Sequence, residues 1–103
     1  MIESMKLAAL LQKHRDGDAT TLPARDALAM APTAGAEVFG EKRAVIAPGA
    51  PADLILVDLS EPSTQPVHDP TSALVYAAHA GQVHTTICDG QVLMHDRRVE
   101  VCD

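Results

Sequence analysis

The chain has 103 residues, of which 47% are hydrophobic and 21% charged, and its formal net charge is −6. This length allows one domain at most, or a part of one, and the composition is typical of folded chains. The negative charge argues against nucleic acid or an anionic membrane as a partner, because both attract cationic surfaces. No apolar run is long enough to span a membrane, and two cysteines fit a reducing compartment. We therefore expect a cytoplasmic protein.

Two helices are expected in the first forty residues. Residues 2–15 carry apolar side chains over a wide sector, which predicts a helix that is covered on more than one side. A second helix should begin at Pro23, because proline is favoured at the first helical position. Pro32 is expected to interrupt it, and a short restarted helix should end at Gly40.

The middle of the chain changes to strand and loop character. Residues 54–57 are four consecutive apolar residues between turn signals, which favours a strand buried on both faces. A loop with three prolines follows, and Asp69 before Pro70 predicts a helix cap. The short helix that begins there should end at Gly81.

The last twenty residues predict a three-stranded meander. Asp89-Gly90 is a strong signal for a two-residue hairpin turn, and Asp96-Arg97 is expected to form a second tight turn. The expected cross-strand pairs are Cys88 with Gln91, Ile87 with Val92, Thr85 with Met94, Met94 with Val99, and Val92 with Val101. One face of the meander is then almost wholly apolar and the other mostly polar, which supports this register.

The two cysteines, Cys88 and Cys102, fall on the outer strands of this meander, with Gln91 between them. Two strand spacings amount to about 9–10 Å, which is more than the Cα atoms of a disulfide tolerate. We therefore expect two free thiols.

No motif for metal-dependent or nucleophilic catalysis is visible. The histidines form no H-x-H pair and no H-E-x-x-H helix, and no serine has a G-x-S-x-G setting. The segment around Gly49 contains prolines, which remove N–H donors, so it does not predict a phosphate-binding loop. The five histidines are His14, His68, His79, His84 and His95. We predict no catalytic, no cofactor-binding and no metal-ligating residue in this chain.

Three of the histidines have an alternative interpretation. His68 beside Asp69 would suit a metal ligand or a base with its carboxylate, but a loop histidine next to a helix cap is favoured. His84 and His95 fall on the polar face of the meander, where a weak adventitious metal site is conceivable. Two ligands fall short of the three or four of a true zinc site. An independent small enzyme that uses these histidines therefore ranks last among our hypotheses.

Three stretches resemble the C-terminal end of the metal-dependent amidohydrolase superfamily, in the branch of cytosine deaminase-like enzymes, chlorohydrolase-like enzymes and adenosine-analogue deaminases. They are "PARDALAMAPTAGAEVFG", "IAPGAPADLILVDL" and "HDPTSALVYAAHAGQVHTTICDGQVLMHDRRV". They follow the family's order and spacing over almost the whole chain. The patterns G-x-x-ADLI-x-x-D and V-x-x-x-I-x-DG-x-V are fairly specific together. Pro32 departs from the family, whose members usually have Thr at this position.

The resemblance implies an α+β chain with two parts. Residues 1–42 resemble the last helices of a (β/α)8 barrel. Residues 43–103 resemble the C-terminal part of a small antiparallel β-sandwich, with one short helix near residues 70–80. The resemblance also implies a much longer full-length enzyme with zinc or iron. Its ligands, an H-x-H, two later histidines and an aspartate, would all precede Met1, so none is carried over onto this sequence.

The function implied by the resemblance is that of a fragment: the C-terminal structural portion of a hydrolase acting on C–N or C–Cl bonds of a small heterocycle, such as an amino-purine, pyrimidine or triazine. The chain alone is predicted to be inactive. The alternative is a non-catalytic, self-associating module encoded by a truncated gene. Orphaned apolar patches and bare strand edges would drive association. We expect a homodimer or larger homo-oligomer, or binding to the missing N-terminal barrel portion, and no nucleic-acid or membrane partner.

Overall fold

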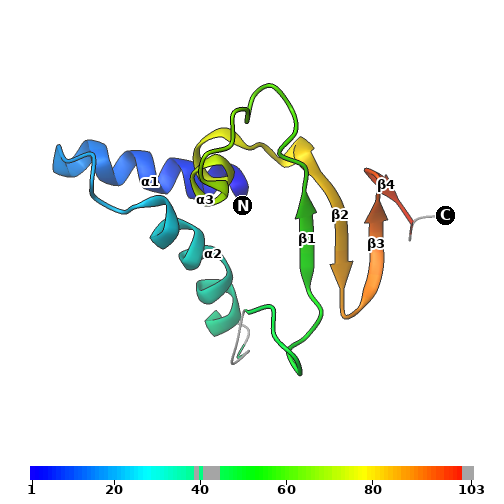
Figure 1. The fold of residues 1–103 in the computed structure, drawn as a ribbon. Coiled ribbons are helices and arrows are strands. Elements are labelled where there is room, and N and C mark those ends of the chain that lie inside the picture. Colours follow the sequence, from blue (N-terminus) through cyan, green and yellow to red (C-terminus); the bar gives the residue numbers. More distant parts are fainter. Residues whose placement is uncertain (39, 41–44, 101–103) are drawn as a thin grey trace.

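The computed structural model describes residues 1–38, 40 and 45–100. The elements in chain order are helices α1 (Ile2–Asp16) and α2 (Ala24–Val38), strand β1 (Leu54–Val57), helix α3 (Pro70–Ser72), the π-helical turn η1 (Ala73–Ala77), the 3-10 turn η2 (Ala80–Gln82), and strands β2 (Val83–Cys88), β3 (Gln91–His95) and β4 (Arg98–Val99). The helices lie on one side and the four-stranded antiparallel sheet on the other, with β1 nearest the helices (Figure 1). The predicted α+β class is therefore confirmed.

Helix α1 forms as predicted, but only one of its sides is covered. It ends at Gly17, whose φ of 65° makes the left-handed cap that glycine favours. Its buried residues, Ile2, Met5 and Ala9, share one stripe of the helix. The other apolar side chains are 46–58% exposed: Leu7, Leu10 and Leu11. The expected second covering layer is thus not supplied by the described residues. No helix among these residues combines the length and apolar character needed to cross a membrane.

Helix α2 differs from the expectation at Pro32. The helix is continuous from Ala24 to Val38 with Pro32 inside it, so the predicted interruption is wrong. An interior proline removes one backbone N–H and crowds the preceding turn, at a cost of about 3 kcal/mol. The surrounding alanines, the best helix formers, and the burial of Ala24 and Ala27 against neighbouring elements offset this cost. Gly40, the predicted end, lies just beyond the helix with a φ of 73°.

The core lies between α1, α2 and η1. One cluster joins Ala9 of α1, Ala27 of α2 and Val75 of η1, and small side chains let these elements approach closely. A second cluster joins Ile2 with Ala78, and the partly buried side chains of Leu28, Leu74 and Val83, among others, pack against it. Both clusters combine residues from the two sequence segments 1–42 and 43–103, so these segments share one core.

Asp69 caps α3, as the sequence predicts. Its carboxylate accepts hydrogen bonds from the backbone N–H groups of Thr71 at 3.2 Å and Ser72 at 3.1 Å, and from the Ser72 hydroxyl at 2.6 Å. These bonds, led by that of the Ser72 side chain, hold the pKa of Asp69 below its usual value. The helical segment ends at Ala77, with Ala78 as its C-cap, and not at Gly81, which lies within η2.

The sheet has the order β1-β2-β3-β4. Both predicted turns are present, and their central residues all have positive φ, as a type I′ turn requires: Asp89 (49°), Gly90 (75°), Asp96 (47°) and Arg97 (62°). Three predicted pairs are observed: Cys88 with Gln91, Ile87 with Val92, and Met94 with Val99. The predicted pair of Val92 with Val101 lies outside the described residues.

A β-bulge changes the rest of the register. Met94 pairs with Thr86 and not with Thr85, because the pairing shifts between Thr86 and Ile87. The predicted pair of Thr85 with Met94 is therefore wrong. The predicted division of the meander into an apolar and a polar face is also wrong on the side of the bulge away from the first turn. Thr85 is only 4% exposed, and its hydroxyl lies 3.3 Å from Nδ1 of His95, which the predicted register placed on the opposite face.

Strand β1 is confirmed, but its predicted burial on both faces is wrong. Ile55 and Leu56 are about half exposed, at 48% and 52%. β1 lies at the edge of the sheet and pairs only with β2 among the described strands. The described residues form one sheet, so the second sheet of a β-sandwich stays a prediction.

Candidate functional site

The structure brings His84 and His95 together on the sheet. Their ring centroids lie 5.4 Å apart with an interplanar angle of 86°. The Thr85 hydroxyl lies 2.8 Å from His84 Nδ1 and 3.3 Å from His95 Nδ1. The other ring nitrogen of His84, Nε2, lies 3.5 Å from Asp96 Oδ1. The two histidines are thus neighbours across the strands, as the sequence suggested.

This histidine pair does not amount to a metal centre. Both Nδ1 atoms face the same Thr85 hydroxyl, which engages one nitrogen of each ring. In the part of the chain that the structure describes, no group of three or more His, Cys, Asp or Glu side chains could hold a metal ion. A structural or catalytic zinc takes at least three protein ligands. The described residues therefore do not fit a zinc site.

The other candidate histidine, His68, is exposed beside Asp69. The Asp69 carboxylate is occupied by the cap of α3, so it is not oriented as a partner for the imidazole. His79, which the sequence did not single out, has Nε2 3.2 Å from Glu61 Oε2 in an exposed pair. Exposed pairs of this kind contribute little to stability.

A buried polar network escaped the sequence analysis. Gln82 is 1% exposed, and its Nε2 donates to Thr64 Oγ1 at 3.3 Å. Its Oε1 accepts from the His79 backbone N–H at 3.0 Å, and its backbone carbonyl accepts from the Asp58 N–H at 2.8 Å. The Thr64 hydroxyl lies 2.9 Å from the Leu59 carbonyl. The network fastens the loop after β1 to η2, and nothing in the local sequence signals it.

Cys88 lies exposed at the end of β2 with a free thiol. The negative charge of Asp53, and the hydrogen bond with it, raise the pKa of the Cys88 thiol, which makes it a poor nucleophile at neutral pH. The Asp53 carboxylate also accepts from the Asp89 N–H at 2.6 Å, which ties the first hairpin turn to β1. Cys102 lies outside the described residues, so its free thiol stays a prediction.

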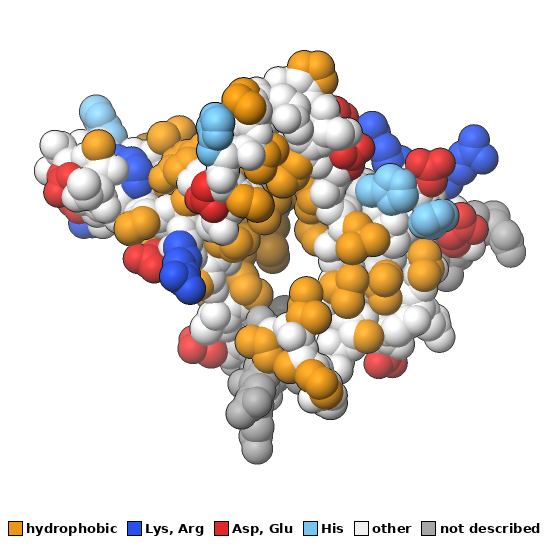
Figure 2. Space-filling model, viewed as in Figure 1, with side chains coloured by type: hydrophobic (Ala, Val, Ile, Leu, Met, Phe, Trp, Pro, Cys, Tyr) orange, Lys and Arg blue, Asp and Glu red, His pale blue; other side chains and the backbone are white. Residues whose placement is uncertain are grey.

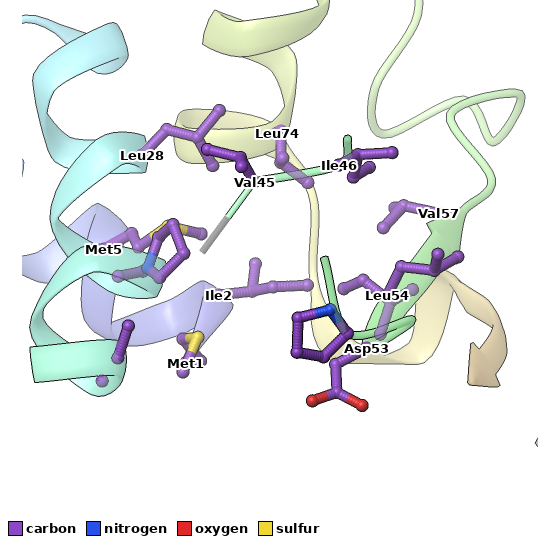
Figure 3. Close-up of a pocket in the computed structure, with 16 residues that line it drawn as sticks. Met1, Ile2, Met5, Leu28, Val45, Ile46, Asp53, Leu54, Val57 and Leu74 are labelled. Atoms are coloured by element: carbon purple, nitrogen blue, oxygen red, sulfur yellow. The ribbon is translucent and has the colours of Figure 1, made fainter. Parts of the chain in front are cut away.

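A groove of about 710 Å³ opens between the helices and β1 (Figure 2). The groove is lined by apolar side chains from α1 and the residue before it, α2, η1, β1 and the segment before β1. Those labelled in Figure 3 are Met1, Ile2, Met5, Leu28, Val45, Ile46, Leu54, Val57 and Leu74. Among the described residues that line the groove, Asp53 is the only one with a charged side chain, and its carboxylate points away from the apolar side chains (Figure 3). Substrate sites combine apolar walls with convergent polar groups. The described lining residues offer no convergent polar groups, so their chemistry suits packing against another apolar surface.

The sequence matches the model of the amidohydrolase family over residues 1–93. It is 48% identical over 99 residues to a 5'-deoxyadenosine deaminase of Methanoregula boonei, covering 96% of this chain and 22% of that protein. It is 43% identical over 103 residues to a 5-methylthioadenosine/S-adenosylhomocysteine deaminase of Haloarcula marismortui, covering 100% of this chain and 24% of that protein. The chain thus spans about a quarter of the length of the curated relatives it matches.

Solved structures agree with this assignment. An adenosine deaminase from Xanthomonas campestris with bound zinc superposes with a TM-score of 0.93 at 37% identity, over 100% of this chain and 24% of that one. An atrazine chlorohydrolase from Arthrobacter aurescens, complexed with zinc, has a TM-score of 0.85 at 30% identity, over 100% of this chain and 23% of that one. The family match covers most of the chain, and the fold agrees along its whole length. The chain belongs to the amidohydrolase family.

Proposed function

We propose that this chain is the structural portion of an amidohydrolase-type deaminase that hydrolyses a C–N bond of an adenosine-like nucleoside. The observation that carries this proposal is the 48% identity to a 5'-deoxyadenosine deaminase over 96% of the chain. Identity to the triazine hydrolases is lower, at 28–30%. An amino-purine is therefore better supported as the substrate class than a chlorotriazine.

The role proposed for these residues is support and not chemistry. The described residues offer no ligand set for a metal ion, so we assign no step of the hydrolysis to them. Their buried groups, the helical clusters and the Gln82 network, join structural elements to one another. We propose that the metal ligands and substrate contacts belong to the remaining three quarters of such an enzyme, and that it works in the cytoplasm, where Cys88 stays reduced.

A chimera tests this proposal. In the deaminase of Methanoregula boonei, the 99 matching residues are replaced by the corresponding residues of this chain. We expect the purified chimera to release ammonia from 5'-deoxyadenosine, because this segment supplies structural support while the catalytic residues stay in place. The isolated 103-residue chain should release none, and the deaminase without its matching segment is the matched control.

Two outcomes would contradict the proposal. Ammonia release by the isolated chain, in proportion to its concentration, would place catalytic residues within it. A chimera that folds and binds zinc but does not turn over would show that this segment carries more than structural support. Circular dichroism and metal analysis of the chimera separate this second case from simple misfolding.

A second candidate function rests on a different observation. Ile46 and Leu56 have exposed apolar side chains, and one edge of β1 has no partner among the described strands. Such surfaces mark interaction sites. A non-catalytic, self-associating module would show a defined oligomer together with an inactive chimera.

A further inference from the structure

Two β-bulges bring three polar side chains of the sheet together. The residues on either side of His84 pair with β1, so His84 is the extra residue of the first bulge. Beyond the bulge between β2 and β3, Met94 pairs with Thr86, and this register continues to His95 opposite Thr85. The Thr85 hydroxyl consequently lies 2.8 Å from His84 Nδ1 and 3.3 Å from His95 Nδ1. The hydroxyl is thus shared by the two rings.

One hydroxyl cannot serve both nitrogens in the same way. A hydroxyl has a single proton to donate, and a neutral imidazole has one N–H and one bare nitrogen. The Thr85 hydroxyl therefore donates to one Nδ1 and accepts from the N–H of the other. Thr85 is only 4% exposed, so a hydroxyl proton without an acceptor would be costly. The protonation state of one histidine thus constrains the tautomer of the other.

His84 has anionic neighbours. Its Nε2 lies 3.5 Å from Oδ1 of Asp96, which belongs to the second turn. Asp58, in the segment after β1, is also nearby: hydrogen bonds from Ser60 and, to a smaller extent, the charge of His84 hold the pKa of the Asp58 carboxyl below its usual value. Nearby carboxylates favour the charged form of an imidazole. An added proton is therefore stabilised on His84.

His95 has a cationic neighbour instead. Arg98 of β4 is its cross-strand partner, and the side chains of opposite residues lie on the same face of a sheet. Arg97, the other cation of this turn, directs its guanidinium toward η2, where it lies 3.5 Å from the position that a Cβ on Gly81 would take. A like charge disfavours further positive charge. Of the two rings, His84 is the better place for one added proton.

We propose that His84, Thr85 and His95 form a pH-sensitive switch that holds one added proton, and that the charge of His84 sets the tautomer of His95. In the neutral pair, His84 directs its Nε2–H to Asp96, and its Nδ1 accepts from the Thr85 hydroxyl. That hydroxyl in turn accepts from His95 Nδ1–H. When water supplies a proton to His84 Nδ1, the hydroxyl turns and donates to His95 Nδ1. His95 releases its Nδ1 proton to water and takes one at Nε2, so the pair gains one proton in total.

The switch acts on the second turn. The backbone carbonyl of His84 accepts from the Arg97 N–H at 3.1 Å, and its ring faces Asp96. Because a charged imidazole binds a carboxylate more strongly than a neutral one does, the first proton should hold the turn more tightly. A second proton would direct two N–H groups at one hydroxyl and place like charges on rings whose centroids are 5.4 Å apart. Stronger acid should therefore release the turn.

Long-range ¹H–¹⁵N NMR spectra of the histidine rings test the proposal, because they distinguish both tautomers from the charged ring. As pH falls through about 6.5, where histidine ordinarily titrates, His84 should become doubly protonated. His95 should stay neutral over this range while its N–H moves from Nδ1 to Nε2. A His95 ring that is doubly protonated before or together with His84 overturns the proposal, and so does a His95 tautomer that does not change. If the isolated chain is not folded by circular dichroism, the same spectra of the chimera decide.

Substitutions at two neighbouring threonines of β2 sharpen the test. Thr85→Val removes the shared hydroxyl and keeps the shape of the side chain, so the tautomer change of His95 should be lost. Thr85→Ser keeps the hydroxyl and should retain the change, as should the matched control Thr86→Val. A tautomer change that persists in Thr85→Val, or one that is lost in Thr86→Val as well, overturns the proposal. If Thr85→Val does not fold, the unmodified chain and Thr85→Ser decide.

The switch and the proposed deaminase role can fail separately. The chimera assay measures ammonia release, whereas the ring spectra measure protonation at named nitrogens. An active chimera with an unchanging His95 tautomer would retain the proposed function and reject the switch. An inactive chimera in which the tautomer changes would do the reverse.

Discussion

The helical region and the sheet are stabilised in different ways. The buried apolar residues of the described chain all lie in or directly beside α1, α2 and η1: Ile2, Met5, Ala9, Ala24, Ala27, Val75 and Ala78. The strands bury one residue, the polar Thr85. The sheet is ordered by its backbone ladder and two type I′ turns, while the helices are ordered by side-chain packing. This contrast indicates that the helices already have a core on one side, whereas the sheet still has apolar surface to cover.

The same substitution in each region should give the largest contrast. Val75 is fully buried and Val92 is 47% exposed. Val75→Ala removes two buried methyl groups and leaves a cavity, so it should lower the free energy of unfolding by about 2 kcal/mol. Val92→Ala should lower the free energy of unfolding by less than about 1 kcal/mol, because nearly half of the Val92 side chain is already exposed to water. Urea denaturation measures both, and equal losses would contradict the contrast between the regions.

Two glycine substitutions should act in opposite directions. Gly90 has a φ of 75° in the first hairpin turn, where an L-residue is strained, so Gly90→Ala should destabilise the sheet by about 1 kcal/mol. Gly35 lies inside α2, and a methyl group added there meets open space. Gly35→Ala should therefore stabilise the chain by about 0.5–1 kcal/mol. Thermal unfolding of both variants gives the signs, and a stabilising Gly90→Ala would show that the turn is not type I′.

A pH-dependent effect at the cap of α3 should be the smallest. Because hydrogen bonds from Ser72 and Thr71 lower the pKa of Asp69, its stabilising effect is present above the unfolded pKa of about 3.9 and is lost as pH falls through the lower folded value. Asp69→Ala should therefore be less stable than the unmodified chain at neutral pH and equally stable in acid. Asp69→Asn, which still caps, should lose this pH dependence. A difference that persists in strong acid would mean that the carboxylate charge is not responsible.

Local sequence signals predicted the elements whose cause is local. Asp69 before Pro70 predicted a cap, because a carboxylate there can reach the next N–H groups. Asp89-Gly90 and Asp96-Arg97 predicted turns, because positive φ is tolerated best by glycine and by short polar residues. The alignment next to each turn follows from the turn type, so the pairs closest to each turn were predicted correctly.

The errors arise where distant residues decide. The bulge between Thr86 and Ile87 brings Thr85 to His95, a contact across strands that no turn encodes. Pro32 stays inside α2, where neighbouring alanines and packing outweigh its local cost. The four apolar residues of β1 predict a strand with both faces buried, but the pattern does not identify the residues that would pack against those faces.

The candidate site was predicted only in outline. The meander placed His84 and His95 near each other, and the structure agrees. Gln82 could not be found, because its burial depends on Thr64, 18 residues away in sequence, and on the loop after β1. A single glutamine in the segment "AGQV" has no periodic or motif signal.

The central claim is that these residues support an amidohydrolase fold and do not themselves hold its metal. Calorimetric titration of the purified chain with zinc chloride tests this claim most directly. We predict no saturable one-to-one binding at micromolar zinc, because His84 and His95 lack a third ligand among the described residues. Tight binding of one zinc per chain that is lost in both His84→Ala and His95→Ala would contradict the claim, and would place a metal centre on the sheet.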